Sequence, residues 1–348
     1  KKFKNIYNLK YVNGDDFQSI DYDSSDIRTI LNTSLTFENK TIYDLKAQAN
    51  SIKGTFVEFD KRYKSIKNKI KNIDGVITSV LPYPLQNYIA HICVKSNKPI
   101  ILWQHGEHTE TEESFLLSSE LQYCTHYLTF GKNLKDKLQK YVISKEHNLT
   151  YVETVGSISK TINTTSEDYI LYATGKWFFN KCHFHPKVDP DSRLYDAQKK
   201  IIEFLNTISH AHNVVLKMNN TPGFNEIPFK TSNINVTNQF SFTKWLQQSK
   251  IVILDVPGTT LIEALSTKLP IFALAGRIPW SDNTTKLLQK RAVVANSPEE
   301  LIQYLNDYLV NRIYPASLTN NEFLISFGSK FSKDKTKRNI FYALDSIV

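Results

Sequence analysis

The sequence predicts two α/β domains in tandem, each built on a parallel sheet with helices on its faces. Short apolar segments with strand character alternate with helical patterns from residue 74 to residue 310, and such alternation is typical of βα units and parallel sheets. The chain has 348 residues, and since domains usually hold about 100–200 residues, two domains are expected. We place the boundary at Gly156, so that residues 1–156 form the first domain and residues 157–348 the second.

The first half shows four apolar segments that we interpret as strands. Residues 43–70 form one or two Lys-rich helical patterns, and the first forty residues are ambiguous. The expected strands span residues 76–81, 99–103, 126–130 and 151–155, and the expected helices begin at Pro84 and span residues 114–123 and 134–141.

The second half repeats this alternation. The expected strands span residues 169–173, 213–217, 234–236, 251–255, 270–274 and 292–294, and the expected helices span residues 195–208, 242–248, 260–265 and 298–310. Tandem α/β domains bind ligands at the carboxyl ends of their strands, in the cleft between the domains. The loops that follow strands are therefore where we expect the functional residues.

Composition excludes several classes of protein. The chain holds 43 Lys and Arg against 34 Asp and Glu, a net charge of +9, which suits anionic partners such as nucleotides or a membrane surface. No nucleic-acid recognition motif accompanies this charge, so we expect no nucleic-acid partner. The three cysteines, Cys93, Cys124 and Cys182, lie far apart, which argues against a disulfide framework and favours a reducing cytoplasm. No apolar run approaches the roughly 18 residues that span a bilayer.

The most informative segment is the turn that follows the predicted strand 251–255. The strand ends in Asp255, and Gly258, Thr259 and Thr260 lead into a helix. Gly lets the backbone approach a ligand closely, and the free amides and the positive end of the helix dipole favour a phosphate. Glu263 lies one turn further, where a carboxylate can bind ribose hydroxyls. The alternative is an ordinary capped helix with Glu263 in solvent.

The run from Gly258 to Leu265, with Lys268, Leu269 and Pro270 after it, resembles the donor-nucleotide signature of GT-B glycosyltransferases. Related bacterial families build capsule, O-antigen (lipopolysaccharide) and teichoic-acid polymers. The resemblance covers roughly residues 169–306 in pattern. It implies two Rossmann-like doubly wound domains facing a central cleft, with nucleotide phosphates at the Thr-rich turn and Glu263 on the ribose. It implies no resident cofactor, because the nucleotide-sugar is a substrate.

The same resemblance suggests two further donor-binding loops. Gly175 and Lys176 follow the first strand of the second domain, where such enzymes often place a Gly-containing turn and a basic residue near the donor phosphates. Lys217 closes the strand 213–217. In related enzymes a His-Pro pair commonly follows this Lys, whereas Met218 and Asn219 follow it here. A strand-end Lys in solvent is the alternative for Lys217.

The first domain offers a candidate acceptor site directly after the strand 99–103. His105 is the candidate catalytic residue, because a His titrates near pH 6.5 and serves as a base or a phosphate ligand. Gly106 and His108 are assigned to the acceptor side, and Glu107 is the neighbouring catalytic carboxylate. A His-Gly pair here resembles the acceptor motif of teichoic and capsule transferases. A structural loop His beside solvated acids is the alternative.

Two other features of the sequence concern metal binding and contact with a membrane. His183, His185, Asp189 and Asp191 lie close in sequence, but their spacing fixes no third ligand, and we expect no metal. Basic stretches at residues 61–71 and 330–338 are either solvated faces or contacts with an anionic membrane or a lipid-linked acceptor.

Three functions remain open from the sequence. The first is a glycosyltransferase, or a sugar-phosphate transferase, that moves a unit from a nucleotide-activated donor to a bacterial surface glycan, in the cytoplasm or at the inner face of the membrane. The second is a sugar-nucleotide 2-epimerase of the same fold, although Thr259 stands where a second Gly is usual in that turn. The third is a non-catalytic binding subunit.

Overall fold

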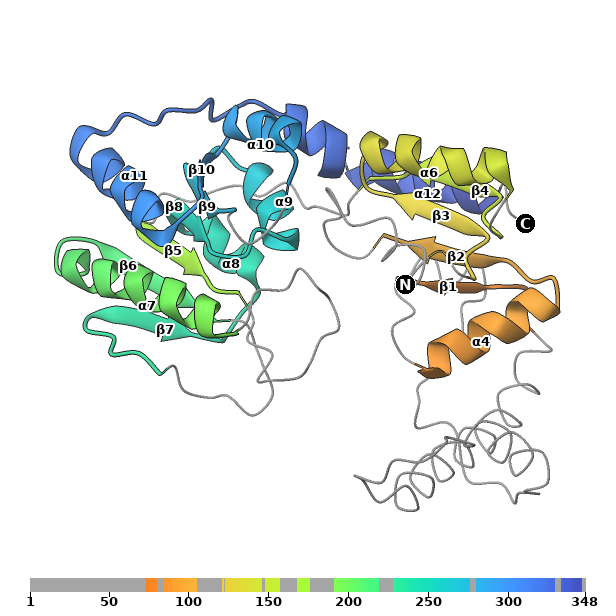
Figure 1. The fold of residues 1–348 in the computed structure, drawn as a ribbon, viewed down its shortest axis with the longest axis horizontal. Coiled ribbons are helices and arrows are strands. Elements are labelled where there is room, and N and C mark those ends of the chain that lie inside the picture. The colour runs from red at the N-terminus through yellow and green to blue at the C-terminus, as the bar shows by residue number, and fades with distance from the viewer. Residues whose placement is uncertain are drawn as a thin grey trace, which may run out of the picture. The chain divides into compact units, whose positions relative to one another are not determined.

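The computed structural model contains two α/β sheets (Figure 1). It describes residues 73–79, 84–104, 121, 123–145, 148–156, 168–175, 191–218, 228–275, 280–328 and 333–345. Within these ranges the predicted strand–helix alternation is confirmed. The predicted helix at 114–123 lies almost entirely outside them, and the domain boundary at Gly156 stays a prediction.

The first sheet has four strands in the order β1-β2-β3-β4. Its strands are short, and the two inner strands are the most buried, because Ile100 and Leu102 in β2 and Tyr127 in β3 have no exposed surface. Strands β1 and β2 run parallel, with Val76 opposite Ile100. The elements of this part are β1 (Val76–Thr78), α4 (Pro84–Lys95), β2 (Ile100–Trp103), β3 (His126–Thr129), α6 (Lys132–Ser144) and β4 (Tyr151–Thr154).

The second sheet has six parallel strands in the order β10-β9-β8-β5-β6-β7. Counted from β5, this is the 3-2-1-4-5-6 order of the Rossmann fold, whose order reverses between the first and fourth strands. The strands are β5 (Tyr169–Ala173), β6 (Asn213–Lys217), β7 (Ile234–Thr237), β8 (Ser249–Leu254), β9 (Ile271–Leu274) and β10 (Val293–Ala295). The helices are α7 (Asp191–Ile208), α8 (Phe242–Gln247), α9 (Thr259–Leu265), α10 (Asp282–Gln289) and α11 (Pro298–Asn311).

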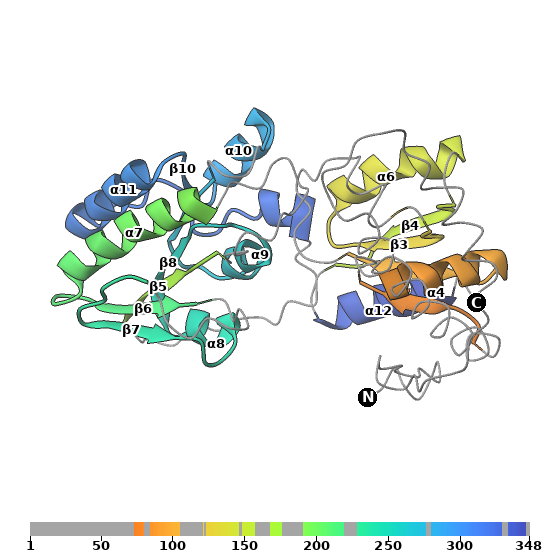
Figure 2. The same cartoon turned by 60° about the horizontal axis from the view of Figure 1, so that its bottom comes forward.

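Both faces of the second sheet are covered, as the near-continuous apolar strands predict. Side chains alternate between the faces of a strand, and in β8 Ile253 packs in the cluster of α7 and α11 while Val252 packs in the cluster of α8, α9 and α10. Figures 1 and 2 show α7 and α11 side by side on one face. The second sheet is therefore doubly wound.

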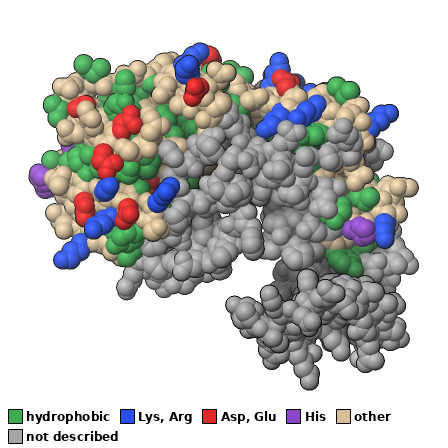
Figure 3. All heavy atoms as spheres, in the orientation of Figure 1, with side chains coloured by type: hydrophobic (Ala, Val, Ile, Leu, Met, Phe, Trp, Pro, Cys, Tyr) green, Lys and Arg blue, Asp and Glu red, His purple; other side chains and the backbone are tan. Residues whose placement is uncertain are grey.

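The described surface mixes charges of both signs. Figure 3 shows Lys and Arg interspersed with Asp and Glu over the part that contains the second sheet. Exposed ion pairs join Lys200 to Glu299 and Lys290 to Glu322. Such pairs contribute little to stability, so this face is an ordinary solvated surface.

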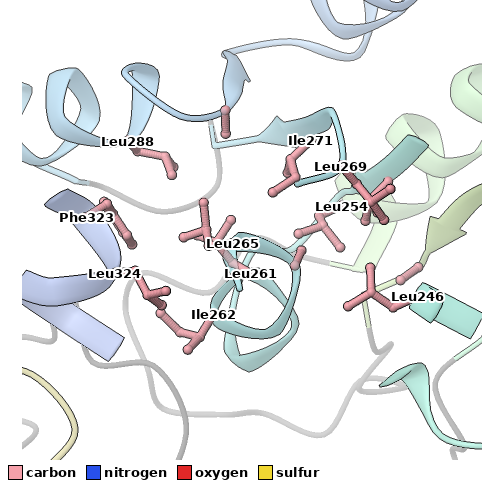
Figure 4. Close-up of a cluster of buried hydrophobic side chains, with 14 of the residues drawn as sticks. Leu246, Leu254, Leu261, Ile262, Leu265, Leu269, Ile271, Leu288, Phe323 and Leu324 are labelled. Atoms are coloured by element: carbon pink, nitrogen blue, oxygen red, sulfur yellow. The ribbon is translucent and has the colours of Figure 1, made fainter. Parts of the chain in front are cut away.

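Three described elements were not predicted. They are α10, a π-helical turn η3 (Leu324–Gly328) and α12 (Lys333–Asp345). Phe323 and Leu324 pack against the α9 residues Ile262 and Leu265 in one buried cluster (Figure 4). The short helix α9 is thereby held from both the sheet side and the η3 side.

Candidate functional site

The candidate site lies at the carboxyl ends of β5 and β8, where the strand order of the second sheet reverses. These strands are neighbours, with Ala173 opposite Leu254. In open α/β sheets ligands bind outside the carboxyl ends of the strands at this switch point. Two predicted donor-binding segments begin here, because Thr174 and Gly175 follow β5, and Asp255 to Gly258 follow β8.

A buried carboxylate joins the two loops. Asp255 has no exposed surface, and its Oδ2 accepts hydrogen bonds from the Tyr172 hydroxyl at 3.0 Å and from Gln198 Nε2 at 2.7 Å. Its Oδ1 accepts from the backbone N–H of Gly175. A buried carboxylate costs free energy unless such donors surround it. The hydrogen bonds to Asp255 therefore hold the loops after β5 and β8 together. Its oxygens are occupied by the protein itself, so a ligand role is not needed to explain it.

The loop after β5 approaches the β8 loop so closely that only glycine fits. A Cβ at Gly175 would lie 2.3 Å from Val256 Cγ2 and 3.3 Å from Asp255 Oδ1. Gln198 Nε2 also donates to the Gly175 carbonyl at 3.3 Å. Of the predicted pair, Gly175 therefore lies beside the donor turn, whereas Lys176 lies outside the described residues.

The predicted donor turn leads from β8 into α9. Gly258 caps α9, and Thr259 and Thr260 are its first two residues. A Cβ on Gly258 would meet no atom within 4 Å, so the space beside this residue is open. The first backbone amides of a helix have no partner within the helix. The amides of Thr259 and Thr260 therefore have no partner within α9, whereas the N–H of Leu261 donates to the Gly258 carbonyl.

Glu263 is the one acidic residue of α9, and it is only partly buried. Leu261, Ile262, Ala264 and Leu265 anchor the helix in the core. The Glu263 Oε2 accepts a hydrogen bond from Thr243 Oγ1 at 2.7 Å. Burial raises the pKa of Glu263, and the Thr243 hydroxyl opposes that rise. The interpretation of Glu263 as a fully solvated side chain is therefore wrong.

Lys217 is buried at the carboxyl end of β6, with 9% of its surface exposed. Its Nζ donates to the carbonyls of Met218 at 2.8 Å and Asn238 at 3.4 Å. Burial lowers the pKa of this ammonium group. The alternative of a solvated strand-end Lys is wrong, and in the described part of the chain no carboxylate pairs with Lys217. A buried cation without an acidic partner suits an anionic ligand.

Several predicted residues lie outside the described ranges. They include the acceptor-side residues His105, Gly106, Glu107 and His108, and the histidines His183 and His185. Among the residues that the structure does describe, no group of three His, Cys, Asp or Glu side chains is placed to hold a metal ion. In the same ranges, no helix combines the length and apolar character needed to cross a bilayer.

Three residues that contact the candidate site residues Asp255 and Glu263 escaped the sequence prediction, namely Tyr172, Gln198 and Thr243. Gln198 carried a signal, because it falls on the face of α7 that also holds Leu194, Ile201 and Leu205. A polar residue on an apolar helix face needs a partner. Tyr172 and Thr243 carried no such signal in the sequence, because neither interrupts the pattern of polar and apolar residues around it.

Comparison with known families gives a match over most of the chain. The model of the LIC12162 family transferase matches residues 17–306. A comparison with curated protein sequences finds no match.

Solved structures share the fold at low sequence identity. The UDP-GlcNAc 2-epimerase from Neisseria meningitidis, bound to UDP-GlcNAc, has 11% identity and a TM-score of 0.54, with 89% of this chain and 84% of that chain covered. A putative UDP-N-acetylglucosamine 2-epimerase from Listeria monocytogenes has 13% identity and a TM-score of 0.51, covering 82% and 79%. Anabaena Alr3699/HepE in complex with UDP has 9% identity and a TM-score of 0.50, covering 84% of each chain. These likenesses, with the two parallel sheets, confirm the predicted Rossmann-like GT-B fold class.

Proposed function

The chain belongs to the LIC12162 family of transferases, and we propose that it transfers a glycosyl or sugar-phosphate unit from a nucleotide-activated donor to a bacterial surface-glycan acceptor. The acceptor is a glycan or a lipid-linked glycan. The proposal makes the second sheet the donor side and the first half of the chain the acceptor side.

The observation that carries the proposal is the turn between β8 and α9. Gly258, Thr259 and Thr260 place helix-terminal amides at the strand-order switch point, and the space beside Gly258 is open. Glu263 lies one turn away with a partly buried carboxylate. The backbone amides and the helix dipole are suited to binding the phosphates, and the carboxylate is suited to binding the ribose hydroxyls. Together they match the two ends of a nucleoside phosphate.

Basic residues would offset the charge that develops on the leaving nucleotide. Lys217 is held at the carboxyl edge of β6, and Lys176 follows Gly175 in the chain. Cations and helix termini aimed at a developing charge stabilise a transition state. These groups would supply that stabilisation from the protein's own residues.

The acceptor chemistry is assigned to His105. As general base it would take the proton of the acceptor hydroxyl while the acceptor oxygen attacks the donor. The bond between the transferred unit and the nucleotide phosphate breaks, and the nucleotide leaves with the bonding electrons. Glu107 is the alternative base.

We place the protein in the cytoplasm, with contact to the inner face of the membrane. Lys335, Lys337 and Arg338 are exposed on α12, and clustered cations near an anionic surface favour binding. Flotation with vesicles of phosphatidylglycerol tests this, and failure to co-float at low salt would contradict it.

The experiment for the function has two steps. A thermal-shift panel with CMP, CDP, UDP and GDP should find a nucleotide that raises the melting temperature, because a ligand bound only by the native state stabilises it. UDP is the first to try, since two of the similar structures hold UDP or UDP-GlcNAc. Turnover of the nucleotide-sugar is then followed with and without acceptor glycan.

The outcomes separate the three functions. Turnover that requires acceptor supports the transferase. Conversion of donor without acceptor indicates an epimerase, and the lack of any nucleotide binding indicates a non-catalytic subunit.

A further inference from the structure

Resting on the proposed function, we infer that Thr243 is a positioning residue that orients the Glu263 carboxylate to accept both hydroxyls of a ribose. The consequence is selectivity. The site would bind ribonucleotides in preference to nucleotides that lack the 2′ and 3′ hydroxyls.

The inference starts from the hydrogen bond between two helices. Thr243 Oγ1 donates to Glu263 Oε2 at 2.7 Å. Thr243 is the second residue of α8, directly after Phe242, and Ser241 caps that helix by accepting from the Lys244 N–H at 3.4 Å. The hydroxyl therefore projects from the first turn of α8 toward the middle of α9.

Both helices are fixed by packing, so the bond has a defined geometry. Leu246 of α8 and the α9 residues Leu261 and Leu265 are buried in one hydrophobic cluster. Close-packed cores hold their side chains in single rotamers. Glu263 by itself is a long side chain with considerable rotamer freedom, which costs free energy to order. A bond from a fixed neighbour removes much of that cost before a ligand arrives.

The remaining acceptor capacity of Glu263 fits a diol. An ionised carboxylate has two oxygens and about four lone-pair sites. In the described part of the chain Glu263 accepts only the Thr243 bond, which leaves Oε1 and part of Oε2. The vicinal hydroxyls of a ribose donate two hydrogens about as far apart as two carboxylate oxygens. The same face of α9 begins at Thr259 and Thr260, where the phosphates are proposed to bind.

The protonation of Glu263 gives a second way to test this contact. Burial raises the pKa of Glu263, while the Thr243 hydroxyl lowers it. Diol binding needs the ionised carboxylate, so affinity falls as the pH drops through this pKa. Removing the hydroxyl removes the lowering effect, so the fall should begin at a higher pH.

The experiment compares Thr243→Val with Thr243→Ser in the full chain. Valine keeps the shape and removes the hydroxyl, and serine keeps the hydroxyl. Calorimetry measures the affinity for the nucleoside diphosphate that binds best among UDP, CDP and GDP. It also measures the affinity for the 2′,3′-dideoxy form of that nucleotide. We expect Thr243→Val to weaken the ribonucleotide about fivefold to tenfold, the scale of one ordinary hydrogen bond. The dideoxy form should change less than about twofold, and Thr243→Ser should bind as the parent protein does.

A titration between pH 4.5 and 8 completes the test, with Glu263→Gln as the variant without a titrating group. Thr243→Val should move the acid loss of affinity to higher pH, and Glu263→Gln should leave only the part that comes from the nucleotide's own terminal phosphate, whose second pKa is about 6. Equal weakening of the ribose and dideoxy forms, or an unchanged pH profile, would overturn the inference while leaving nucleotide binding intact. If the parent protein binds none of these nucleotides, the proposed function itself fails.

Discussion

Asp255 and Lys217 are two charged side chains that the protein buries at one edge of the second sheet. They differ in how the described residues compensate them, because Asp255 accepts hydrogen bonds from Tyr172, Gly175 and Gln198 whereas Lys217 donates to two backbone carbonyls. The first arrangement holds loops together, and under the proposed function the second would keep a positive charge available for a ligand. Burial of charge without full compensation is expected at binding sites more than elsewhere.

Replacing Asp255 with Asn should destabilise the protein by about 2–3 kcal/mol, the scale of hydrogen bonds to a charged group. One oxygen becomes an amide that points hydrogens at protein donors. Urea unfolding measures the loss. Tyr172→Phe removes a single donor and should cost about 1 kcal/mol. An unfolding midpoint of Asp255→Asn equal to that of the parent would contradict the role of Asp255 in holding the loops together.

The buried Lys217 should make stability depend on pH. Because burial lowers its folded pKa below the ordinary 10.5, the unfolded chain binds more protons between that lowered value and 10.5. The free energy of unfolding should then rise with pH in this window. Urea unfolding at pH 7.5 and 9.5 should show a rise for the parent that Lys217→Met lacks.

Lys200→Met is the matched control. Lys200 is exposed and its pKa is raised, first by its hydrogen bond to Glu299, so it titrates above this window. Its removal should leave the pH dependence unchanged. Equal slopes for the parent and Lys217→Met would show that Lys217 is solvated in solution.

The predictable residues of the site are those that shape a local pattern. The turn at Gly258 and the carboxylate of Glu263 follow from the order of strand, Gly, Thr and helix. The partners Tyr172 and Thr243 depend on which strands and helices become neighbours. That information is in the topology of the sheet and not in the sequence near either residue.

At the scale of elements, the loop after β5 is fixed by a close approach. A methyl group at Gly175 would collide with Val256. Gly175→Ala should therefore cost about 1–3 kcal/mol, as overpacking does. Because Val256 is partly exposed at 37%, Val256→Ala by itself should cost little.

Combining Gly175→Ala with Val256→Ala should recover most of the stability that Gly175→Ala loses, because substitutions at contacting residues do not have additive effects. A double-mutant cycle by urea unfolding measures this. Strictly additive effects would show that the two loops do not touch in solution.

Most strands and long helices were predictable because their apolar residues follow a clear period. The strand 213–217 and the helix beginning at Pro298 match the structure at their predicted starts. Helix α10 escaped because only Thr284 and Leu288 are buried in it, which leaves no readable stripe. Helix α12 begins with alternating charges, and its buried Ile340, Ala343 and Leu344 lie near its end.

For the whole molecule, the proposed function assigns catalysis to the first half of the chain and nucleotide binding to the second half. His105→Ala should lower turnover about 10²–10⁴-fold, the usual contribution of general base catalysis. Nucleotide affinity should stay nearly intact, because it belongs to the second sheet. Steady-state kinetics and calorimetry on the same variant separate the two effects.

Glu107→Gln is the control for that experiment. If His105→Ala keeps near-native turnover and Glu107→Gln abolishes it, the catalytic role belongs to the carboxylate. This division could be proposed from sequence because each candidate follows a predicted strand.

The central claim is that a nucleotide binds at the β8–α9 turn with its ribose on Glu263. Calorimetric titration of the parent and of Glu263→Ala with the best nucleotide tests it most directly. The account predicts that Glu263→Ala weakens binding by about 1.5–3 kcal/mol, the scale of hydrogen bonds to a charged group. An unchanged affinity would remove Glu263 from the site and contradict the account.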